Sequence, residues 1–189
     1  LLELAGLDHL RRGLLVPLHH GAQGRLSGID DGLQQTIEQV RRIRGRRNLR
    51  LDEGLVFLSD SRTNAGLDRI STFRKMIIYE KAGDRFMVLL SAGNLSVAQS
   101  IREILQVEKL DNGTAPPITI WNATSMYDAA RVLGSAVRRV FDQDGPSLKA
   151  SGVDFNATMI FGGQIKGEAM RLFLVYSEGN FIEATSENC

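Results

Sequence analysis

Short apolar runs along the middle of the chain predict β-strands. The runs are Gly54–Asp60 (GLVFLSD), Lys75–Glu80 (KMIIYE) and Phe86–Ala92 (FMVLLSA), and their length and alternation are typical of strands. Ala82-Gly83-Asp84 supplies a turn between the second run and the third. Three strands in quick succession predict an antiparallel sheet.

The apolar spacing then becomes helical. A helix over Leu95–Leu105 would place four apolar side chains on one face, at positions 95, 98, 101 and 105. A second helix is expected to start at Ser125, because Ser125 and Asp128 approximate a capping box, and to run through Val140. Asp144-Gly145-Pro146 is expected to break or interrupt this helix.

Two further strands are predicted near the end of the chain, at Phe155–Phe161 and Arg171–Tyr176, with a turn over Gly162–Gly167 between them. A Gly/Pro-bearing loop is expected at Asp111–Pro117. The resulting order, βββ, αα, ββ, groups strands apart from helices. This grouping predicts an α+β layered domain rather than a parallel βαβ repeat.

Residues 1–50 differ in composition from the remainder. They carry nine arginines, no lysine and five acidic residues, a net charge of +4, whereas residues 51–189 carry 14 basic and 17 acidic residues, a net charge of −3. Every aromatic residue lies at Phe57 or later. A segment without aromatics is a poor core builder. We therefore expect an Arg-rich leader over residues 1–50, outside the fold, and one domain over residues 51–189.

The leader contains three features with candidate functions. Gln34–Ile43 could form a short helix, and Arg41–Arg47 could bind nucleic acid or an acidic membrane surface electrostatically. No aromatic residue is interleaved for base stacking, so a solvated segment is expected instead. His19-His20 has no further ligand at helical spacing, and no metal site is expected.

Length and cysteine content set further bounds. A chain of 189 residues with 43% hydrophobic content can bury one sizeable core. The one cysteine, Cys189, can form no disulfide within the chain, so a reducing compartment is expected. No apolar run reaches the roughly 18 residues of a membrane span, and Leu1–Pro17 has charged residues in place of a signal core. We expect a soluble, cytoplasmic protein without membrane association.

Three motifs lie at the predicted strand ends. Asp60-Ser61-Arg62-Thr63-Asn64-Ala65-Gly66 follows the first strand, Lys75 opens the second, and Ser91-Ala92-Gly93-Asn94 separates the third from the first helix. This combination resembles the proteasome β-subunits, which are N-terminal-nucleophile hydrolases. Asp154–Gln164 and Ser177–Thr185 also resemble the bacterial proteasome-type protease called Anbu.

The resemblance implies a four-layer αββα sandwich that hydrolyses peptide bonds without a metal or an organic cofactor. In such enzymes the hydroxyl of an N-terminal Thr or Ser attacks the peptide carbonyl, and its own α-amine takes the proton, directly or through water. The resemblance also implies a homo-oligomer, either a ring or a helical self-compartmentalising assembly, that acts on peptide substrates.

Roles for site residues follow from the resemblance by matching position. Lys75 would lower the proton affinity of the α-amine by like charge, Asp60 would anchor Lys75, and Arg62 would support this pair. The backbone N–H of Gly93 would stabilise the oxyanion. The residues expected to line the substrate cleft, where an extended peptide pairs as an added strand, are Thr63, Asn64 and Ala65.

Each role has a plainer alternative. Asp60 could simply open a β-turn, as Asp commonly does, and Lys75 could be an ordinary strand-end charge. Gly93 could only cap the junction between strand and helix, which is compatible with the oxyanion role. The joint spacing of Asp60, Arg62, Gly66 and Lys75 favours the site.

The nucleophile is missing from its expected place. The first strand of the proteasome pattern should lie just before Gly54, where Arg44–Glu53 contains neither Thr nor Ser and shows no strand pattern. Thr36 and Ser27 are too far upstream. We interpret residues 1–50 as the product of a shifted reading frame or a wrong start, and the chain as truncated after the segment that ends at Thr185. As written, the chain is expected to be inactive.

Two other classes of function are possible from the sequence. A non-catalytic structural subunit of a proteasome-like assembly would use an N-terminal extension in place of the nucleophile, and an ordered helix at Gln34–Ile43 would favour it. An Arg-mediated nucleic-acid binder would show binding that falls steeply with salt and vanishes without residues 1–50. Retention of the Asp60 and Lys75 pair favours the peptidase, and no nucleic-acid partner is expected.

Overall fold

The computed structural model describes residues 2–8, 11–18, 48–51, 54–60, 62–64, 70–72, 74–111, 113 and 116–185. The chain forms two compact units, Leu1–Arg74 and Lys75–Cys189, and each unit is described by itself. Among the described residues, no helix combines the length and the apolar character needed to cross a membrane.

The first unit is made of β-strands. Its four-stranded sheet has the order β2-β1-β4-β3, and β5 pairs with β6 in a separate ribbon. All of these pairings are antiparallel. The strands are β1 (Leu2–Asp8), β2 (Arg11–Leu18), β3 (Asn48–Leu51), β4 (Gly54–Asp60), β5 (Arg62–Asn64) and β6 (Ile70–Thr72).

The strands before Gly54 differ from the sequence prediction, which has none there. β1 pairs with β4 along its whole length, from Leu2↔Asp60 to Asp8↔Gly54, and β3 pairs with the other edge of β4. β1 and β2 are rich in leucine and lack aromatic residues, which gives a weak local strand signal. β3 has only four residues, too few to show a periodicity. The division into a leader over residues 1–50 and a domain over residues 51–189 stays a prediction.

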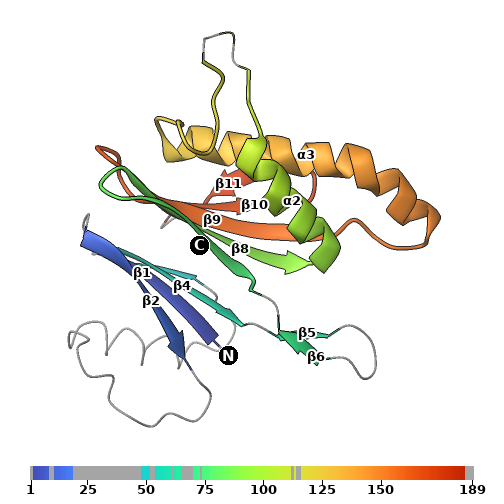
Figure 1. The fold of residues 1–189 in the computed structure, drawn as a ribbon, viewed down its shortest axis with the longest axis horizontal. Helices are drawn as coiled ribbons and strands as arrows, with labels where there is room; N and C mark the ends of the chain where they lie inside the picture. Colours follow the sequence, from blue (N-terminus) through green and yellow to red (C-terminus); the bar gives the residue numbers. More distant parts are fainter. Residues whose placement is uncertain are drawn as a thin grey trace. The chain divides into compact units, whose positions relative to one another are not determined.

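The second unit is a five-stranded antiparallel sheet with two helices on one face (Figure 1). The strand order is β11-β10-β9-β8-β7, so the chain adds neighbouring strands in sequence. This unit confirms the predicted α+β class and antiparallel pairing. Its elements are β7 (Met76–Lys81), β8 (Arg85–Gly93), α2 (Leu95–Val107), α3 (Met126–Ala150), β9 (Ala157–Ile165), β10 (Arg171–Val175) and β11 (Phe181–Glu183).

Both helices start at a capping side chain, Asn94 for α2 and the predicted Ser125 for α3. The Asn94 side chain accepts a hydrogen bond from the Ser96 N–H at 3.0 Å, and Ser125 Oγ accepts one from the Asp128 N–H at 3.1 Å. These bonds satisfy N–H groups that have no partner inside a helix. The core lies between the helices and the sheet, where apolar side chains of both helices pack on those of β7, β8, β9 and β10.

Pro146 does not end α3, contrary to the prediction. The helix continues to Ala150 with Pro146 inside it. Proline in a helix interior removes one backbone bond and costs about 3 kcal/mol, so other contacts must hold the last turn. Leu148 packs against the core, and the Ser151 N–H closes the end by donating to Ser147 O at 3.1 Å.

Gly162 and Gly163 lie inside β9 and not in the predicted turn. A Cβ on Gly163 would come within 2.2 Å of Phe86 O, so a side chain there would collide with the neighbouring strand. Glycine in a strand marks such a close approach of backbones. The turn starts only after Ile165, where the Lys166 N–H donates to Asp84 O at 2.7 Å.

The sheet of the second unit is apolar on both faces. One face carries the side chains that pack under the helices, and the alternation of the strands puts Met76, Val88, Leu90 and Leu172 on the other. A sheet that is apolar on both faces is typical of a layer covered on both sides. The four-layer αββα arrangement stays a prediction, and this pattern supports it.

Candidate functional site

Lys75 and Gly93 lie near the same end of β8 in the second unit. Lys75 directly precedes β7, and its carbonyl accepts a hydrogen bond from the Ser91 N–H at 3.2 Å. The next pair along the ladder is Met76↔Leu90. The backbone of Lys75 is therefore held opposite Ser91, which lies two residues before Gly93.

Gly93 occupies a position that admits no side chain. Its φ of +106° is a conformation that L-residues rarely adopt. A Cβ there would meet the backbone oxygen of Asn156 at 2.3 Å. Glycine is thus required both by the backbone angle and by the neighbouring strand, which explains the sharp junction between β8 and α2.

The register of β8 indicates where the Gly93 N–H points. In an antiparallel ladder, N–H groups two residues apart on one strand face the same neighbour. The Ser91 N–H bonds to Lys75 on the β7 side, so the Gly93 N–H is directed to that side too. The β7–β8 pairing ends at Met76↔Leu90, and Gly93 lies beyond it, exposed to solvent.

The N-terminus of α2 follows immediately. A helix N-terminus carries a partial positive charge, and the first turn of α2 contains no acidic residue that would neutralise it. Together with the N–H of Gly93, this end of the helix suits a developing negative charge. The arrangement can act as a hydrogen-bonding site for an oxyanion.

The remaining predicted site residues belong to the first unit. Asp60 is the last residue of β4, and β5 contains Arg62, Thr63 and Asn64, paired to β6 from Arg62↔Thr72 to Asn64↔Ile70. The sequence did not predict β5 as a strand. Ala65 lies outside the described residues, and the pairing of Asp60 with Lys75 stays a prediction.

Two residues near Gly93 were missed by the sequence reasoning. Asn156 O accepts a hydrogen bond from the Asn94 N–H at 2.7 Å, and Ser177 Oγ contacts both backbone polar groups of Ala157 at 3.1 Å. Both residues lie in the two stretches that resemble Anbu, at Asp154–Gln164 and Ser177–Thr185. That resemblance was the available signal, although it assigned them no role.

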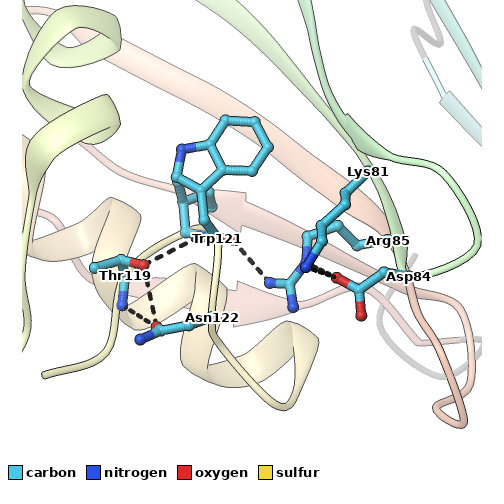
Figure 2. Close-up of polar contacts among 7 residues, drawn as sticks. Lys81, Asp84, Arg85, Thr119, Trp121 and Asn122 are labelled. Atoms are coloured by element: carbon cyan, nitrogen blue, oxygen red, sulfur yellow. Dashed lines mark hydrogen bonds and ion pairs between the residues drawn. The ribbon is translucent and has the colours of Figure 1, made fainter. Parts of the chain in front are cut away.

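A second polar cluster lies at the other end of β8 and is structural (Figure 2). Arg85 is buried, and its guanidinium donates to Asp84 Oδ2 at 2.8 Å and to Ile120 O at 3.0 Å. The second bond ties the connection before α3 to the sheet. Trp121 packs edge-on against Tyr79, with ring centroids 5.8 Å apart, and burial raises the pKa of Tyr79 to about 12.

The Asp84–Arg85 pair predicts a pH-dependent stability. The hydrogen bond from Arg85 holds the pKa of Asp84 below its ordinary value, so the pair stabilises the fold above the unfolded-state pKa and the stabilisation is lost as the pH falls through the folded-state pKa. The difference in unfolding free energy between the wild type and Asp84→Asn should be largest at neutral pH, should begin to shrink as the pH falls through about 4, the ordinary value for an unfolded aspartate, and should vanish only below the lowered folded-state pKa. Urea denaturation between pH 7 and pH 3 measures it. A difference that stays constant over this range would contradict the assignment.

No group of three or more His, Cys, Asp and Glu side chains that could hold a metal ion is present in the described part of the chain. The three histidines, at positions 9, 19 and 20, lie outside the described residues.

Solved structures of Anbu proteins resemble this chain in sequence and in fold. An Anbu (Gly-1) mutant from Hyphomicrobium sp. strain MC1 is 45% identical, with a TM-score of 0.63, over 74% of this chain and 55% of that one. Anbu (ancestral β-subunit) from Yersinia bercovieri is 48% identical, with a TM-score of 0.62, over 75% and 56%. The Anbu complex from Pseudomonas aeruginosa, solved as a helical assembly, is 38% identical, with a TM-score of 0.65, over 75% and 56%.

No protein-family model and no curated protein matches the chain. The chain spans little more than half the length of the Anbu chains that it matches. Identities of 38% to 48% accompany the shared fold, so the likeness extends well beyond topology. Over about three quarters of its length, the chain is therefore similar in sequence and in fold to Anbu proteins, one of which is described as an ancestral β-subunit.

Proposed function

We propose that this chain derives from a proteasome-type peptidase subunit that hydrolyses peptide bonds with an N-terminal Thr or Ser, and that the polypeptide as written lacks this nucleophile. The observation that carries the proposal is the junction at Gly93. Three features meet at this end of β8: the N–H of Gly93, the N-terminus of α2, and the backbone of Lys75, which pairs with Ser91. The kinship with Anbu supports the same conclusion.

The proposed roles follow the chemistry of an α-amine that acts as its own base. The ammonium group of Lys75 disfavours a second positive charge nearby, so it lowers the pKa of the α-amine and leaves more of it free to accept a proton. Asp60 anchors Lys75, and Arg62 supports that pair. As the hydroxyl attacks, the substrate carbonyl oxygen gains negative charge, which the Gly93 N–H stabilises by about 3–4 kcal/mol.

Substrate binding is assigned to strand pairing. β5 is a short strand with residues Arg62–Asn64, and an extended peptide can add to a strand edge through backbone hydrogen bonds. We assign Thr63, Asn64 and Ala65 to this binding segment. Peptides are the substrate class, and neither a cofactor nor a metal takes part in the proposed chemistry.

As part of this proposal, we place the missing nucleophile at the start of a strand that would continue upstream of β3. β3 pairs with β4 from Leu51↔Gly54 to Asn48↔Phe57. A strand continued upstream in the same register would bring the position now held by Gly45 opposite Asp60. Residues 44–47 read Arg-Gly-Arg-Arg, so none of them supplies a hydroxyl at the proposed position.

A self-compartmentalising homo-oligomer in the cytoplasm is the proposed setting. The Pseudomonas aeruginosa relative is described as a helical assembly, and this chain shares its fold over 75% of its length. An enclosed assembly would restrict access to unfolded peptides.

A polypeptide of this sequence is expected to show no peptidase activity. Fluorogenic peptides of varied sequence should not be cleaved above the rate of a buffer blank, and a threonine-directed covalent inhibitor should not label the chain in intact-mass spectrometry. The reason is the absence of Thr and Ser from Arg44–Glu53. Turnover that Lys75→Ala abolishes and that the inhibitor blocks would show that a nucleophile is present and that this proposal is wrong.

A further inference from the structure

The side chain of Ser177 bonds the backbone of Ala157, the first residue of β9, in the place of a neighbouring strand. The β9–β10 ladder ends with Met159↔Val175, and the chain then turns, with the Tyr176 N–H donating to Asn180 O at 2.9 Å. Beyond this point the Ser177 hydroxyl makes the hydrogen bonds to β9. It accepts from the Ala157 N–H and donates to the Ala157 carbonyl, both at 3.1 Å, which are the two bonds that a further residue of β10 would have made.

The peptide group between Asn156 and Ala157 is consequently held from both sides. Its N–H donates to Ser177 Oγ, and its C=O accepts from the Asn94 N–H at 2.7 Å. A peptide group is planar and rigid, so a rotation of this plane would change both hydrogen bonds together. The Ser177 hydroxyl therefore restricts the direction of the Asn156 carbonyl.

That carbonyl defines the space available to Gly93. A Cβ on Gly93 would be only 2.3 Å from Asn156 O, so the carbonyl lies directly against the Gly93 backbone. It also fixes the Asn94 N–H, which belongs to the peptide group that begins with the Gly93 carbonyl. One peptide plane thus connects the hydroxyl of Ser177 to the junction that carries the candidate oxyanion donor.

We propose that Ser177 is a positioning residue for the Gly93 N–H. The expected effect on catalysis rests on the proposed function. The hydrogen bonds that connect Ser177 to the Gly93 junction do not depend on any activity. Ser177 does not contact the substrate. It acts through the Asn156–Ala157 peptide group, and its removal should loosen the junction between β8 and α2.

Amide hydrogen exchange in the chain as it exists tests the structural link. By nuclear magnetic resonance, the Asn94 and Ala157 amides should exchange about tenfold faster in Ser177→Ala, because both partly buried hydrogen bonds of the hydroxyl to Ala157 are lost. Ser177→Thr keeps the hydroxyl and should restore slow exchange. Ser151→Ala removes a hydroxyl from the end of α3 and serves as the matched control, with no change at Asn94. Unchanged exchange at Asn94 in Ser177→Ala would overturn the proposal.

Kinetics in a chain with a restored nucleophile test the catalytic consequence. Ser177→Ala should lower kcat by about tenfold while KM stays constant, since an oxyanion donor acts on the transition state, and Ser177→Thr should recover most of the rate. A fall in the melting temperature without this change in kcat would show a merely structural role and overturn the positioning. If the restored chain has no activity but the Asn94 exchange still responds, the proposed function fails and the link from Ser177 to the Gly93 junction stands.

Discussion

Peptide hydrolysis is expected from a chain in which a threonine-initiated strand replaces residues 1–47 and which is extended to the full length of its relatives. In that restored chain, Lys75→Ala should lower kcat/KM by about 10²–10⁴-fold. The new strand would continue into β3, so that the register of β3 with β4 carries the threonine towards Asp60. It would supply the hydroxyl and the α-amine in one residue. Lys75→Ala removes the nearby positive charge that keeps this amine neutral.

The measurement is steady-state hydrolysis of fluorogenic peptides by the restored chain and its variants, with the oligomeric state followed by light scattering. Lys109→Ala removes the same charge at an exposed position between α2 and α3 and should leave the rate within about twofold. A Lys75→Ala protein that assembles and retains the full rate would refute the tuning role and leave only the fold assignment.

The strands and helices of the second unit were largely predictable because their signals are local. Three of the four predicted apolar positions of α2 are buried, Ala98, Ile101 and Leu105, whereas Leu95 is exposed and Val97 is buried in its place. Ser125 caps α3 as expected. Helices and strands of this kind can be predicted from the pattern of apolar and polar residues within about a dozen positions. Packing on the sheet strengthens such preferences and does not reverse them.

The errors occurred where tertiary contact overrides a local signal. Gly162 and Gly163 are residues typical of turns, yet they lie in β9. At Gly163 only glycine allows the backbone to come this close to Phe86. Pro146 is a helix breaker, yet α3 passes through it because the last turn is anchored by Leu148. β11 has three residues, and its pairing with β10 decides its conformation. None of these outcomes can be read from neighbours in sequence alone.

The candidate site was partly predictable for a different reason. Gly93 and Lys75 were found through a motif, and the structure adds the register that brings Lys75 O against Ser91. Asn156 and Ser177 act through backbone contacts that join residues 20 or more apart in sequence. Side chains that only hold a backbone group leave no pattern of their own, so pairing geometry is needed to find them.

Gly134→Ala is expected to destabilise the second unit by about 2–3 kcal/mol, although alanine is the better helix former. Gly134 lies inside α3 at a buried position. A Cβ there would come within 2.3 Å of Gly179 O. The turn that carries Gly179 is held at this distance by Arg138, whose Nη1 donates to Gly179 O at 2.9 Å, so the carbonyl cannot retreat without breaking that bond.

Gly145→Ala provides the matched control, because it makes the same substitution in the same helix. A Cβ at Gly145 would meet the Phe141 ring at 3.6 Å, an ordinary van der Waals contact. Pro146 follows directly, and its ring disfavours a helical backbone at a preceding residue that has a Cβ. This cost opposes the gain in helix propensity, so Gly145→Ala should change the free energy of unfolding by less than about 1 kcal/mol. Urea denaturation, followed by the fluorescence of the one tryptophan, Trp121, measures both variants. Gly134→Ala should be clearly the less stable variant, because only there does the new Cβ meet a backbone oxygen. A Gly134→Ala protein as stable as Gly145→Ala would show that α3 and the turn at Gly179 are not packed backbone against backbone.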